Sequence, residues 1–561
     1  MKAGERILKQ ILYTGDQYII PLFQRYYEWK ETHWERLWED IIAMLEEETR
    51  KECHFLGSIV CIPNKPEPGK LLQYIVIDGQ QRVITLSLIL CVLRDVAQAM
   101  GKQEMAETIQ DYYLMHRHGK ALDQFKVIPR QRDRKSYFEL ISRSQLSDDT
   151  NIIRAYKYFQ TRVQEFITEH PSNGLDLLLG ATTDQLMLVV ITLDNENPFE
   201  IFKSLNSTGM KLAEADLIRN HVFMQIPLSE QEAFDEEYWL PLERKFEKTE
   251  ILPAIDITDF FRDYLMRNGI YVRPNQTFVA FENDYDIPNI QPETVCKELY
   301  NYADHFNVIR GRKRAATNEL DTALRILRSL SVSTSYPLVL NLMERQRTGT
   351  MSTDDLVKCV RAILGFVMRR YICGESSRAY SRWFPLACRN LGDSPLNNLY
   401  SYLKDKGWPD DSRFITSLVK FNLYSSNYGR EVLEALQANV RTTEPVDVSQ
   451  CTIEHILPQW IHGDDEDNLA WQEALSGDEQ DWRSVWATWV HTIGNLTLVG
   501  YDYNTSMSNK HFQEKKNELA RSKVDLNRYF DKLSSWDAAA IEKRGIELAQ
   551  ACSRIWAEPN A

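Results

Sequence analysis

Two short stretches near the end of the chain carry residues suited to phosphodiester hydrolysis, 452–459 (TIEHILPQ) and 491–500 (HTIGNLTLVG). A metal-dependent nuclease needs a histidine that takes a proton from the attacking water, and oxygen ligands that hold a divalent cation on the scissile phosphate. His455 would be this general base. Its neighbour Glu454 and the later Asn504 would supply oxygen ligands for Mg²⁺ or Mn²⁺.

Three further residues bear on this candidate site. Asn495 would hold the His455 ring in the tautomer that leaves one nitrogen free to accept a proton. His491 is interpreted more broadly, as a contact to phosphate or to the groups around the base. His462 lies in an acidic loop and is expected to face solvent. A single histidine at a strand end is more often structural, but the combined spacing favours a nuclease.

A second stretch suited to ligand binding lies at 72–90 (LQYIVIDGQQRVITLSLIL). Its pattern predicts a strand, a polar turn from Asp78 to Arg82, and a buried helix. Such a turn places backbone amides at a helix N-terminus, where the helix dipole favours an anion, and Arg82 adds a fork suited to phosphate oxygens. The turn therefore predicts a phosphate or nucleotide site. An ordinary turn, in which Asp78 caps the helix and Arg82 pairs with an acid, stays open as the alternative.

Two other segments could contribute to this second site. Arg25, at the end of an extended segment 18–25, would supply another cationic fork, unless it is a surface residue stacked on Tyr27 or Trp29. After a predicted strand at 186–193, a polar loop and a turn bring several polar side chains together. These side chains could bind a sugar, a base or a metal-linked phosphate, and the alternative is that they only form capping and turn hydrogen bonds. These groups are Asn206, Thr208, Lys211, Asp216 and Asn220.

The elements that must position these groups follow from the apolar pattern. Apolar, β-branched runs at 55–62, 72–77 and 186–193 predict buried strands, and the helices between them favour a mixed α/β sheet. Thr32 and Glu35 have the spacing of a capping box at the start of an amphipathic helix.

The rest of the chain is expected to be mostly helical until the candidate nuclease site. Residues 226–440 predict helices without a catalytic constellation, among them the segment 356–371. Strands at 446–456 and 496–499 and a helix at 508–521 then predict a ββα unit that carries the candidate nuclease residues.

The composition favours a soluble, cytosolic protein with several domains. Of 561 residues, 43% are hydrophobic, and neither a membrane-spanning run nor a signal-peptide core is evident. Nine cysteines without a CxxC pair argue against a zinc knuckle and a disulfide framework. The net charge of -14 disfavours indiscriminate coating of nucleic acid but is compatible with local basic grooves at 116–135, 310–314 and 510–523.

With both stretches in view, the chain resembles the GmrSD-type restriction enzymes, a type IV family that attacks modified phage DNA. Its N-terminal part is similar to the family's ParB-like nucleotide-binding domain, and its C-terminal part to an HNH, or His-Me finger, nuclease domain. One departure is Glu454, which stands where an aspartate is common in HNH nucleases. The matching segments are QRYYEW (24–29), FLGSIV (55–60), IDGQQR (77–82), FKSLNSTGMKLAEADLIRN (202–220), EHILPQ (454–459), IGNLTL (493–498) and the region of Asn504 and Lys515.

The resemblance implies an α+β multidomain protein. Its parts would be a mixed α/β ParB-like domain at 1–228, a helical linker domain at 229–435 and a ββα-metal HNH nuclease domain at 436–561. The nuclease base would be His455, oriented by Asn495. The nucleotide-phosphate site would comprise Asp78, Gly79, Gln81 and Arg82, with Arg25, Asn206, Lys211 and Asp216 as further contributors.

The resemblance also implies an activity, in which hydrolysis of a nucleoside triphosphate is coupled to cleavage of double-stranded DNA in the bacterial cytoplasm. The nucleotide state of the Asp78–Arg82 turn would bias the arrangement of the domains and so license or restrain the nuclease. Because one active site per chain must cut two strands, the chain would act as a homodimer or by successive nicks.

Two other functions stay open at this point. The first is a nucleotide-gated DNA-binding switch that grips DNA without cutting it, although His455, Asn495 and Asn504 together count against it. The second is an RNA-directed nuclease or toxin, because a ββα unit grips backbone phosphate and the sequence shows no base-reading element. The sequence specifies neither the DNA modification nor the preferred triphosphate.

Overall fold

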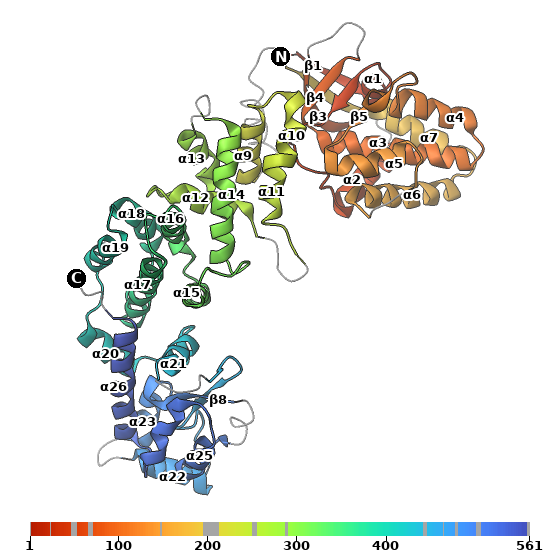
Figure 1. Ribbon diagram of the computed structural model, residues 1–561. Coiled ribbons are helices and arrows are strands. Elements are labelled where there is room, and N and C mark those ends of the chain that lie inside the picture. Colours follow the sequence, from red (N-terminus) through yellow and green to blue (C-terminus); the bar gives the residue numbers. More distant parts are fainter. Residues whose placement is uncertain are drawn as a thin grey trace. The chain divides into compact units, whose positions relative to one another are not determined.

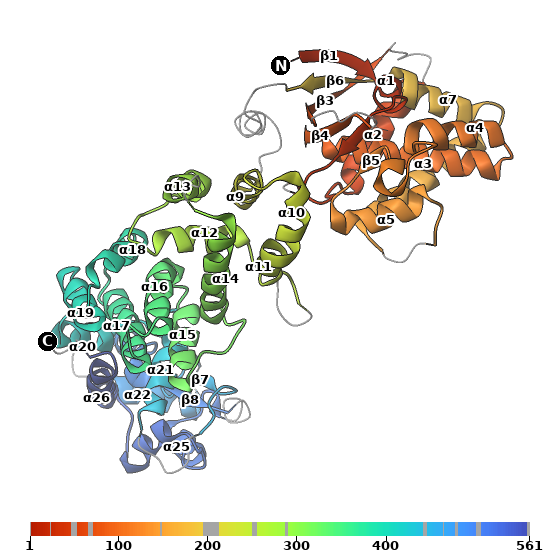
Figure 2. The same ribbon diagram turned by 45° about the horizontal axis from the view of Figure 1, so that its top comes forward.

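In the computed structural model (Figures 1 and 2), the chain forms two compact units. The first comprises Met1–Arg244 and Asn275–Lys297, and the second comprises Lys245–Pro274 and Glu298–Ala561. The predicted division into three domains at other boundaries stays a prediction. The residues that the structure describes are 2–22, 24–45, 53–64, 71–145, 149–193, 213–249, 255–285, 290–440, 446–463, 465–476, 481–500 and 507–557.

The first unit contains a six-stranded sheet in the order β1-β6-β3-β4-β2-β5. Strands β4, β2 and β5 are parallel to one another, whereas β3 is antiparallel to β4 and parallel to β6. The sheet is therefore mixed, as predicted, and the carboxyl ends of β4, β2 and β5 meet at one edge. The strands are β1 (Lys2–Ile7), β2 (Gln17–Ile19), β3 (His54–Pro63), β4 (Gln73–Asp78), β5 (Val127–Ile128) and β6 (Leu186–Thr192).

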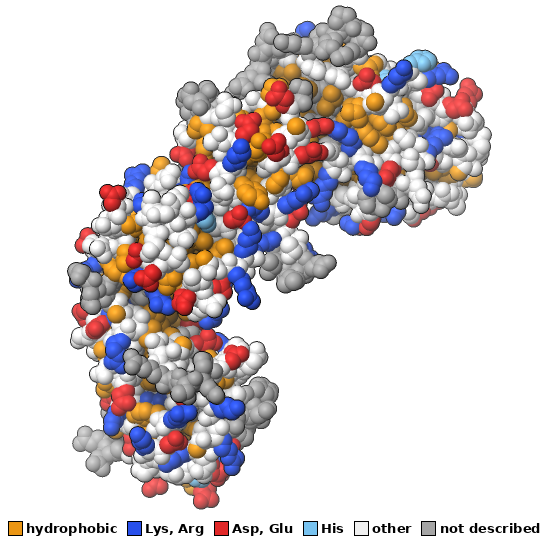
Figure 3. Space-filling model, in the orientation of Figure 1, with side chains coloured by type: hydrophobic (Ala, Val, Ile, Leu, Met, Phe, Trp, Pro, Cys, Tyr) orange, Lys and Arg blue, Asp and Glu red, His pale blue; other side chains and the backbone are white. Residues whose placement is uncertain are grey.

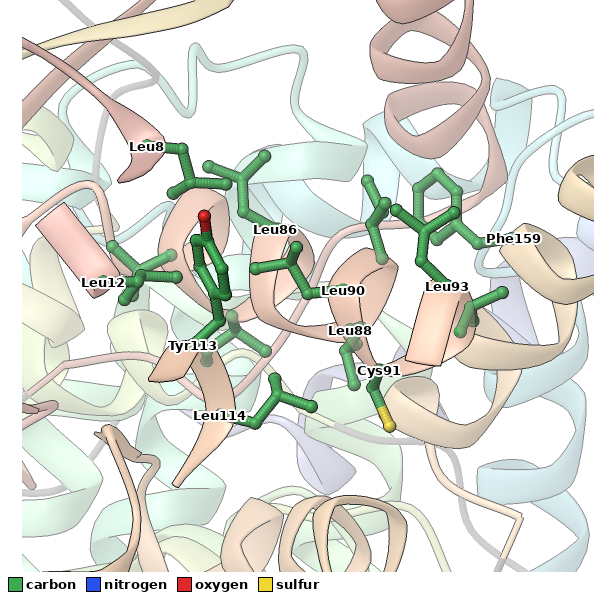
Figure 4. Close-up of a cluster of buried hydrophobic side chains, with 14 of the residues drawn as sticks. Leu8, Leu12, Leu86, Leu88, Leu90, Cys91, Leu93, Tyr113, Leu114 and Phe159 are labelled. Carbon is green, nitrogen blue, oxygen red and sulfur yellow. The ribbon is translucent and has the colours of Figure 1, made fainter. Parts of the chain in front are cut away.

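Helix α3 (Gln80–Ala99) is the centre of this unit's hydrophobic core. Every residue from Val83 to Leu93 is buried, so apolar residues occur all round the helix instead of along one stripe. Figure 4 shows its side chains together with those of α1 (Leu8–Leu12), η1 (Ile109–Leu114) and α6 (Asn151–Glu169). The predicted order of strand, turn and buried helix at 72–90 is confirmed.

Further helices cover α3 and extend the first unit. Helix α6 packs on α3, and α2 and α5 pack on α6. The predicted capping box at Thr32 is wrong, because α2 begins at Glu31, and the Lys30 amide at its N-cap donates to Nδ1 of His33. These helices are α2 (Glu31–Ala43), α4 (Gln103–Thr108), η2 (Ala121–Gln124), α5 (Gln131–Ile141), α7 (Gly174–Gly180), η3 (Ala181–Gln185), α9 (Glu214–Phe223), α10 (Leu228–Phe234), η4 (Asp235–Trp239), α11 (Leu240–Arg244) and α13 (Thr277–Asp284).

The second unit is mostly helical before its small sheet, as predicted. The segment predicted at 356–371 lies within α17 (Thr353–Ile372). Its buried Arg369 donates to carbonyl oxygens of Ser553 and Trp556 and so ties α17 to the end of α26 (Ala538–Ile555). The other helices of the second unit are α12 (Ile257–Met266), α15 (Asn318–Ser329), η7 (Ser333–Ser335), α16 (Tyr336–Arg347), α18 (Tyr380–Asn390), α19 (Pro395–Asp405), α20 (Asp411–Lys420) and α21 (Gly429–Ala438). Two more, η5 (Pro274–Gln276) and α14 (Pro292–Ile309), contain residues of both units.

The last part of the second unit contains an antiparallel pair, β7 (Thr452–His455) and β8 (Leu496–Val499). Strand β8 has the predicted bounds, whereas β7 is shorter than the strand predicted at 446–456 because it pairs with β8 only from Thr452 onward. Helix α26 packs along α20 and α21, which precede β7, and along η8, which directly precedes β8. The remaining helices are α22 (Glu466–Leu475), α23 (Trp482–Trp489), η8 (Ile493–Asn495), α25 (Phe512–Leu519) and η9 (Asp525–Lys532).

The surface carries both signs of charge. On the face shown in Figure 3, Lys and Arg side chains lie among Asp and Glu side chains, so the net charge of -14 leaves cations exposed to solvent. Within the described parts of the chain, no helix is both long enough and apolar enough to span a membrane.

Candidate active site and candidate nucleotide site

The C-terminal candidate site is built on the end of β7. In its pairing with β8, Glu454 lies opposite Thr497 and His455 lies opposite Leu496. Both predicted side chains are nearly buried, with 6% of Glu454 and 3% of His455 exposed. A short strand that ends at His455 therefore carries an acid and an imidazole at consecutive positions.

The His455 ring is hydrogen-bonded to a second histidine. Its Nε2 lies 3.1 Å from Nδ1 of His491, which precedes η8. The Tyr424 ring meets His455 edge-on with 4.3 Å between centroids, and stacks on His491 at 5.4 Å. Tyr424 comes from the segment between α20 and α21, where no local signal in the sequence marks it.

The environment keeps the His455 ring neutral at neutral pH. Burial, with smaller contributions from His491 and Lys515, lowers the pKa of His455 to about 3. Burial also lowers the pKa of His491. A neutral imidazole has a lone pair that can accept a proton, and a bound anionic phosphate would raise its pKa toward the working range of a base.

Lys515 connects Glu454 to the backbone of His455. From α25, its Nζ donates to Oε1 of Glu454 at 2.9 Å and to the carbonyl oxygen of His455 at 2.7 Å. Burial raises the pKa of Glu454 and lowers the pKa of Lys515, and each charge offsets part of the other's shift. The sequence placed Lys515 only within a matching region, without a role.

Asn495 is predicted to orient His455, and its side chain hydrogen-bonds the backbone and not the His455 ring. Its Oδ1 accepts from the amide of Leu457 at 2.7 Å, and its Nδ2 donates to the carbonyl oxygens of Leu457 and Val490. Trp536 also donates to the Asn495 Oδ1. The Asn495 side chain therefore holds the backbone just after His455. The His455 ring is hydrogen-bonded to His491 instead.

Of the two predicted metal ligands, Glu454 lies within the described residues, whereas Asn504 lies outside them. Within the described ranges, no three His, Cys, Asp or Glu side chains lie close enough together to hold a metal ion. A magnesium ion usually retains several waters and binds through one or two carboxylates together with substrate phosphate. Glu454, next to the base, is suited to such a partial ligand set.

The N-terminal candidate site is the turn between β4 and α3. Asp78 ends the strand, and Gly79 occupies the N-cap of α3 in the left-handed region, with φ of 89°. A Cβ on Gly79 would lie 2.7 Å from the carbonyl oxygen of Ser58, so a side chain has no room there. Asp78 does not cap α3, because the N-cap residue of this helix is Gly79 and no side-chain hydrogen bond caps its N-terminus.

Gln81 and Arg82 are both engaged with neighbouring backbone. Gln81 accepts from the amide of Glu28 at 2.9 Å and donates to the carbonyl oxygen of Tyr26 at 2.9 Å, which braces the loop after β2. Arg82 donates from Nη1 to the carbonyl oxygen of Ser58 at 2.7 Å. Within the part of the chain that the structure describes, no acid pairs with Arg82.

Arg25 and Asp216 are brought together by the fold. Nε of Arg25 lies 3.1 Å from Oδ2 of Asp216, the third residue of α9. Burial raises the pKa of Asp216, and the neighbouring Arg25 opposes that shift. Because Gln81 braces the loop that carries Arg25, these residues connect α9 to the turn. Asn206 and Lys211 lie outside the described residues.

Comparison with protein families finds two matches that together cover more than half of the chain. The N-terminal domain of the GmrSD restriction endonuclease matches residues 6–223, and the C-terminal domain of GmrSD restriction endonucleases matches residues 408–551. The chain belongs to the GmrSD family. It is a type IV restriction endonuclease, whose substrate is DNA. A comparison with curated proteins found no match.

The GmrSD matches place both candidate sites inside family domains. The N-terminal match ends with α9 and so includes the turn, Arg25 and Asp216. The C-terminal match includes Tyr424 as well as β7, β8 and Lys515. The helices from 224 to 407 lie between the two matches, where the sequence also showed no catalytic constellation.

One buried cation at the edge of the sheet was missed by sequence reasoning. Arg130 follows β5, is 2% exposed, and lies 3.7 Å from the centroid of the Tyr26 ring. Its Nη1 donates to the carbonyl oxygen of Gln24, whereas its Nε and Nη2 have no hydrogen-bond partner within the described residues. Burial lowers the pKa of Arg130 to about 10. The sequence included it only in a broad basic segment.

Proposed function

We propose that this GmrSD-family protein is a nucleotide-regulated, divalent-metal-dependent endonuclease that cuts modified phage DNA, with His455 as its general base. The observation that carries the proposal is the buried His455 ring beside Glu454, with its Nε2 hydrogen-bonded to His491 at 3.1 Å. Nδ1 is then the ring nitrogen that does not contact His491, and we assign the proton from water to it. The β7–β8 pair followed by α25 has the order of a ββα nuclease.

The chemistry needs few groups from the protein. Nδ1 of His455 takes a proton from the attacking water, and the resulting hydroxide attacks the phosphorus while the bond to the leaving oxygen breaks. The backbone at Leu457, held by Asn495, and the carbonyl of His455, held by Lys515, fix where the ring stands. Both contacts limit the motion of the base, because they restrain the chain that directly follows its Cα.

A divalent cation completes this proposed site. Glu454 would supply one carboxylate oxygen, substrate phosphate and water would supply others, and Asn504 is proposed as a further ligand. A bound Mg²⁺ or Mn²⁺ would stabilise the charge that develops on the leaving oxygen. Lys515 donates to Oε1 of Glu454 and so orients the carboxyl group toward its proposed role as a ligand.

The N-terminal half would bind and hydrolyse a nucleoside triphosphate, as expected of a ParB-like domain. Its proposed site is the edge where the carboxyl ends of β4, β2 and β5 meet, since ligands of open α/β sheets bind at such edges. The turn residues Asp78, Gly79, Gln81 and Arg82, together with Arg25 and Asp216, lie at or are braced to this edge. Asn206 and Lys211 are proposed as further contacts.

The test compares cleavage of unmodified DNA with cleavage of the same DNA carrying phage modifications. The reactions contain Mg²⁺, with and without each nucleoside triphosphate, and use wild type, His455→Ala and the exposed His462→Ala as the matched control. We expect modified DNA alone to be cut, cutting to respond to nucleotide, and His455→Ala to lose at least about 100-fold in rate. The His462→Ala variant should cut like wild type, and removal of Mg²⁺ by a chelator should stop cutting reversibly.

Other outcomes reject parts of the proposal separately. Equal cutting by wild type and His455→Ala removes His455 as the base. Triphosphate hydrolysis without DNA cleavage makes the N-terminal half the working enzyme, and RNA would then be the next substrate to test. Cleavage that ignores nucleotide removes the regulation but leaves the nuclease.

A further inference from the structure

The hydrogen bond between His455 and His491 contains one proton, and its position decides whether His455 can act as a base. The bond joins Nε2 of His455 to Nδ1 of His491 across 3.1 Å. If His491 donated, a neutral His455 would carry its own proton on Nδ1 and have no lone pair for water. If His455 donates from Nε2, its Nδ1 keeps the lone pair.

The surroundings of His491 hold its ring in place beside His455. The carbonyl oxygen of His491 accepts from the amides of Leu423 and Tyr424, at 2.9 and 3.3 Å. The Tyr424 ring lies nearly parallel to the His491 ring, at 12°, and also contacts His455 edge-on. One aromatic side chain therefore restrains both imidazoles.

Asn495, which the sequence predicts to hold the His455 ring in one tautomer, makes its hydrogen bonds to other groups. Asn495 uses its amide for the backbone of Leu457 and Val490, so it restrains the chain after His455 without bonding the ring. In the described part of the site, His491 is the side chain that hydrogen-bonds the His455 ring.

We propose that His491 is a positioning residue that fixes His455 in the tautomer with a proton on Nε2 and a lone pair on Nδ1, and that Tyr424 holds both rings. The inference rests on the proposed role of His455 as the base. During hydrolysis, the proton of water goes to Nδ1 of His455, the hydroxide oxygen forms the bond to phosphorus, and the leaving oxygen takes a proton from solvent. The proton on Nε2 stays in the bond to His491, whose lone pair supports the imidazolium.

The first experiment replaces the acceptor. His491→Leu removes the lone pair, whereas His491→Asn keeps an oxygen acceptor at a similar place on a similar side chain. We expect His491→Leu to lower kcat at least about 100-fold with KM for DNA within about twofold, and His491→Asn to recover at least about tenfold of that loss. His462→Leu and His462→Asn serve as matched controls on an exposed histidine and should cut like wild type.

The second experiment observes the tautomer without relying on cleavage. The full chain with ¹⁵N-labelled histidine should show a His455 ring protonated at Nε2 and unprotonated at Nδ1, with His455→Ala to assign the signals. The opposite tautomer overturns the inference, as does a His491→Leu variant that cuts like wild type. If wild type cuts no nucleic acid while the Nε2 tautomer is present, the proposed function fails and the assignment of the proton stands.

Discussion

The ion pair of Glu454 and Lys515 is buried beside the proposed base, with 6% of Glu454 and none of Lys515 exposed. Burying one charge without its partner costs far more free energy than burying the pair. The same ammonium also donates to the carbonyl oxygen of His455, so the pair both stabilises the site and restrains the base.

Removing one partner of this pair should therefore destabilise the second unit. We expect Lys515→Met to lower the free energy of unfolding by roughly 3–5 kcal/mol, because it leaves a buried carboxylate unpaired. The double variant Glu454→Gln with Lys515→Met should recover much of that stability in thermal or urea unfolding. A Lys515→Met protein as stable as wild type would show that the pair is not buried as described.

Asp263, on α12, makes stability depend on pH in a defined direction. Burial, with a smaller contribution from Asp259 and against the opposing effects of Arg262 and Arg310, raises its pKa from 3.8 to about 8. The folded state keeps the proton up to about pH 8, whereas the unfolded chain releases it near 3.8. Between these values the unfolded state binds fewer protons, so stability falls as pH rises, by at most about 1.4 kcal/mol per pH unit.

Asp263→Asn should remove this dependence. We expect the variant to be more stable than wild type at pH 8 and the difference to shrink steadily toward pH 5, as measured by urea unfolding across that range. Asp393→Asn, in an exposed loop, is the control and should leave the pH profile of wild type unchanged. A difference that grows as pH falls would contradict the assigned direction.

At the scale of whole elements, helix α26 positions η8, the turn beside the proposed base. Its buried Arg544 donates to the carbonyl oxygens of Gly494 and Leu496, at 2.7 and 2.8 Å, on either side of Asn495. Arg369 of α17 holds the other end of the helix through Ser553 and Trp556. The C-terminal helix therefore connects the helical part of the second unit to the turn that restrains the proposed base.

Gly494 packs against helix α26 so closely that a methyl group would not fit between them. A Cβ on Gly494 would lie 2.1 Å from the carbonyl oxygen of Ile541 in α26, so Gly494→Ala must push the helix and the turn apart. We expect a loss of roughly 1–3 kcal/mol in stability together with slower DNA cleavage, measured by unfolding and single-turnover assays. Gly180→Ala, at a helical glycine with open space around its Cβ position, is the control.

At the scale of the whole molecule, the proposed coupling joins a turn in the first unit to a nuclease in the second. Coupling by binding is reciprocal, so nucleotide and DNA must change each other's affinity by the same factor. Regulation that affects only the rate of cleavage is under no such constraint. The two cases can therefore be separated by equilibrium measurements alone.

We expect modified DNA to change the Kd of the regulating nucleotide by about 5- to 150-fold, and nucleotide to change the Kd of DNA equally. The measurement uses the full-length His455→Ala chain, which binds DNA without cutting it, titrated with and without the other ligand. Arg82→Ala in the same background should weaken nucleotide binding and remove the effect on DNA. Unchanged affinities alongside nucleotide-dependent cleavage would restrict the regulation to a catalytic step.

The sequence by itself determined the elements around both sites. Strand, turn and helix at 72–90, the strand at 496–499, and the candidate residues Glu454 and His455 could all be predicted from apolar periodicity and local spacing. The type IV restriction family was also evident from segments in order along the chain. Such features are local, because a strand or helix records its buried face within a few turns of sequence.

Only the tertiary structure decided which side chains meet. His455 bonds His491 from 36 residues away, and Lys515 reaches Glu454 across 61 residues. Arg82, for which the sequence suggested a phosphate, hydrogen-bonds the backbone of Ser58. Asn495, for which it suggested the His455 imidazole, hydrogen-bonds the backbone of Leu457. These contacts depend on how strands pair and helices pack, and local periodicity contains no information about pairing partners.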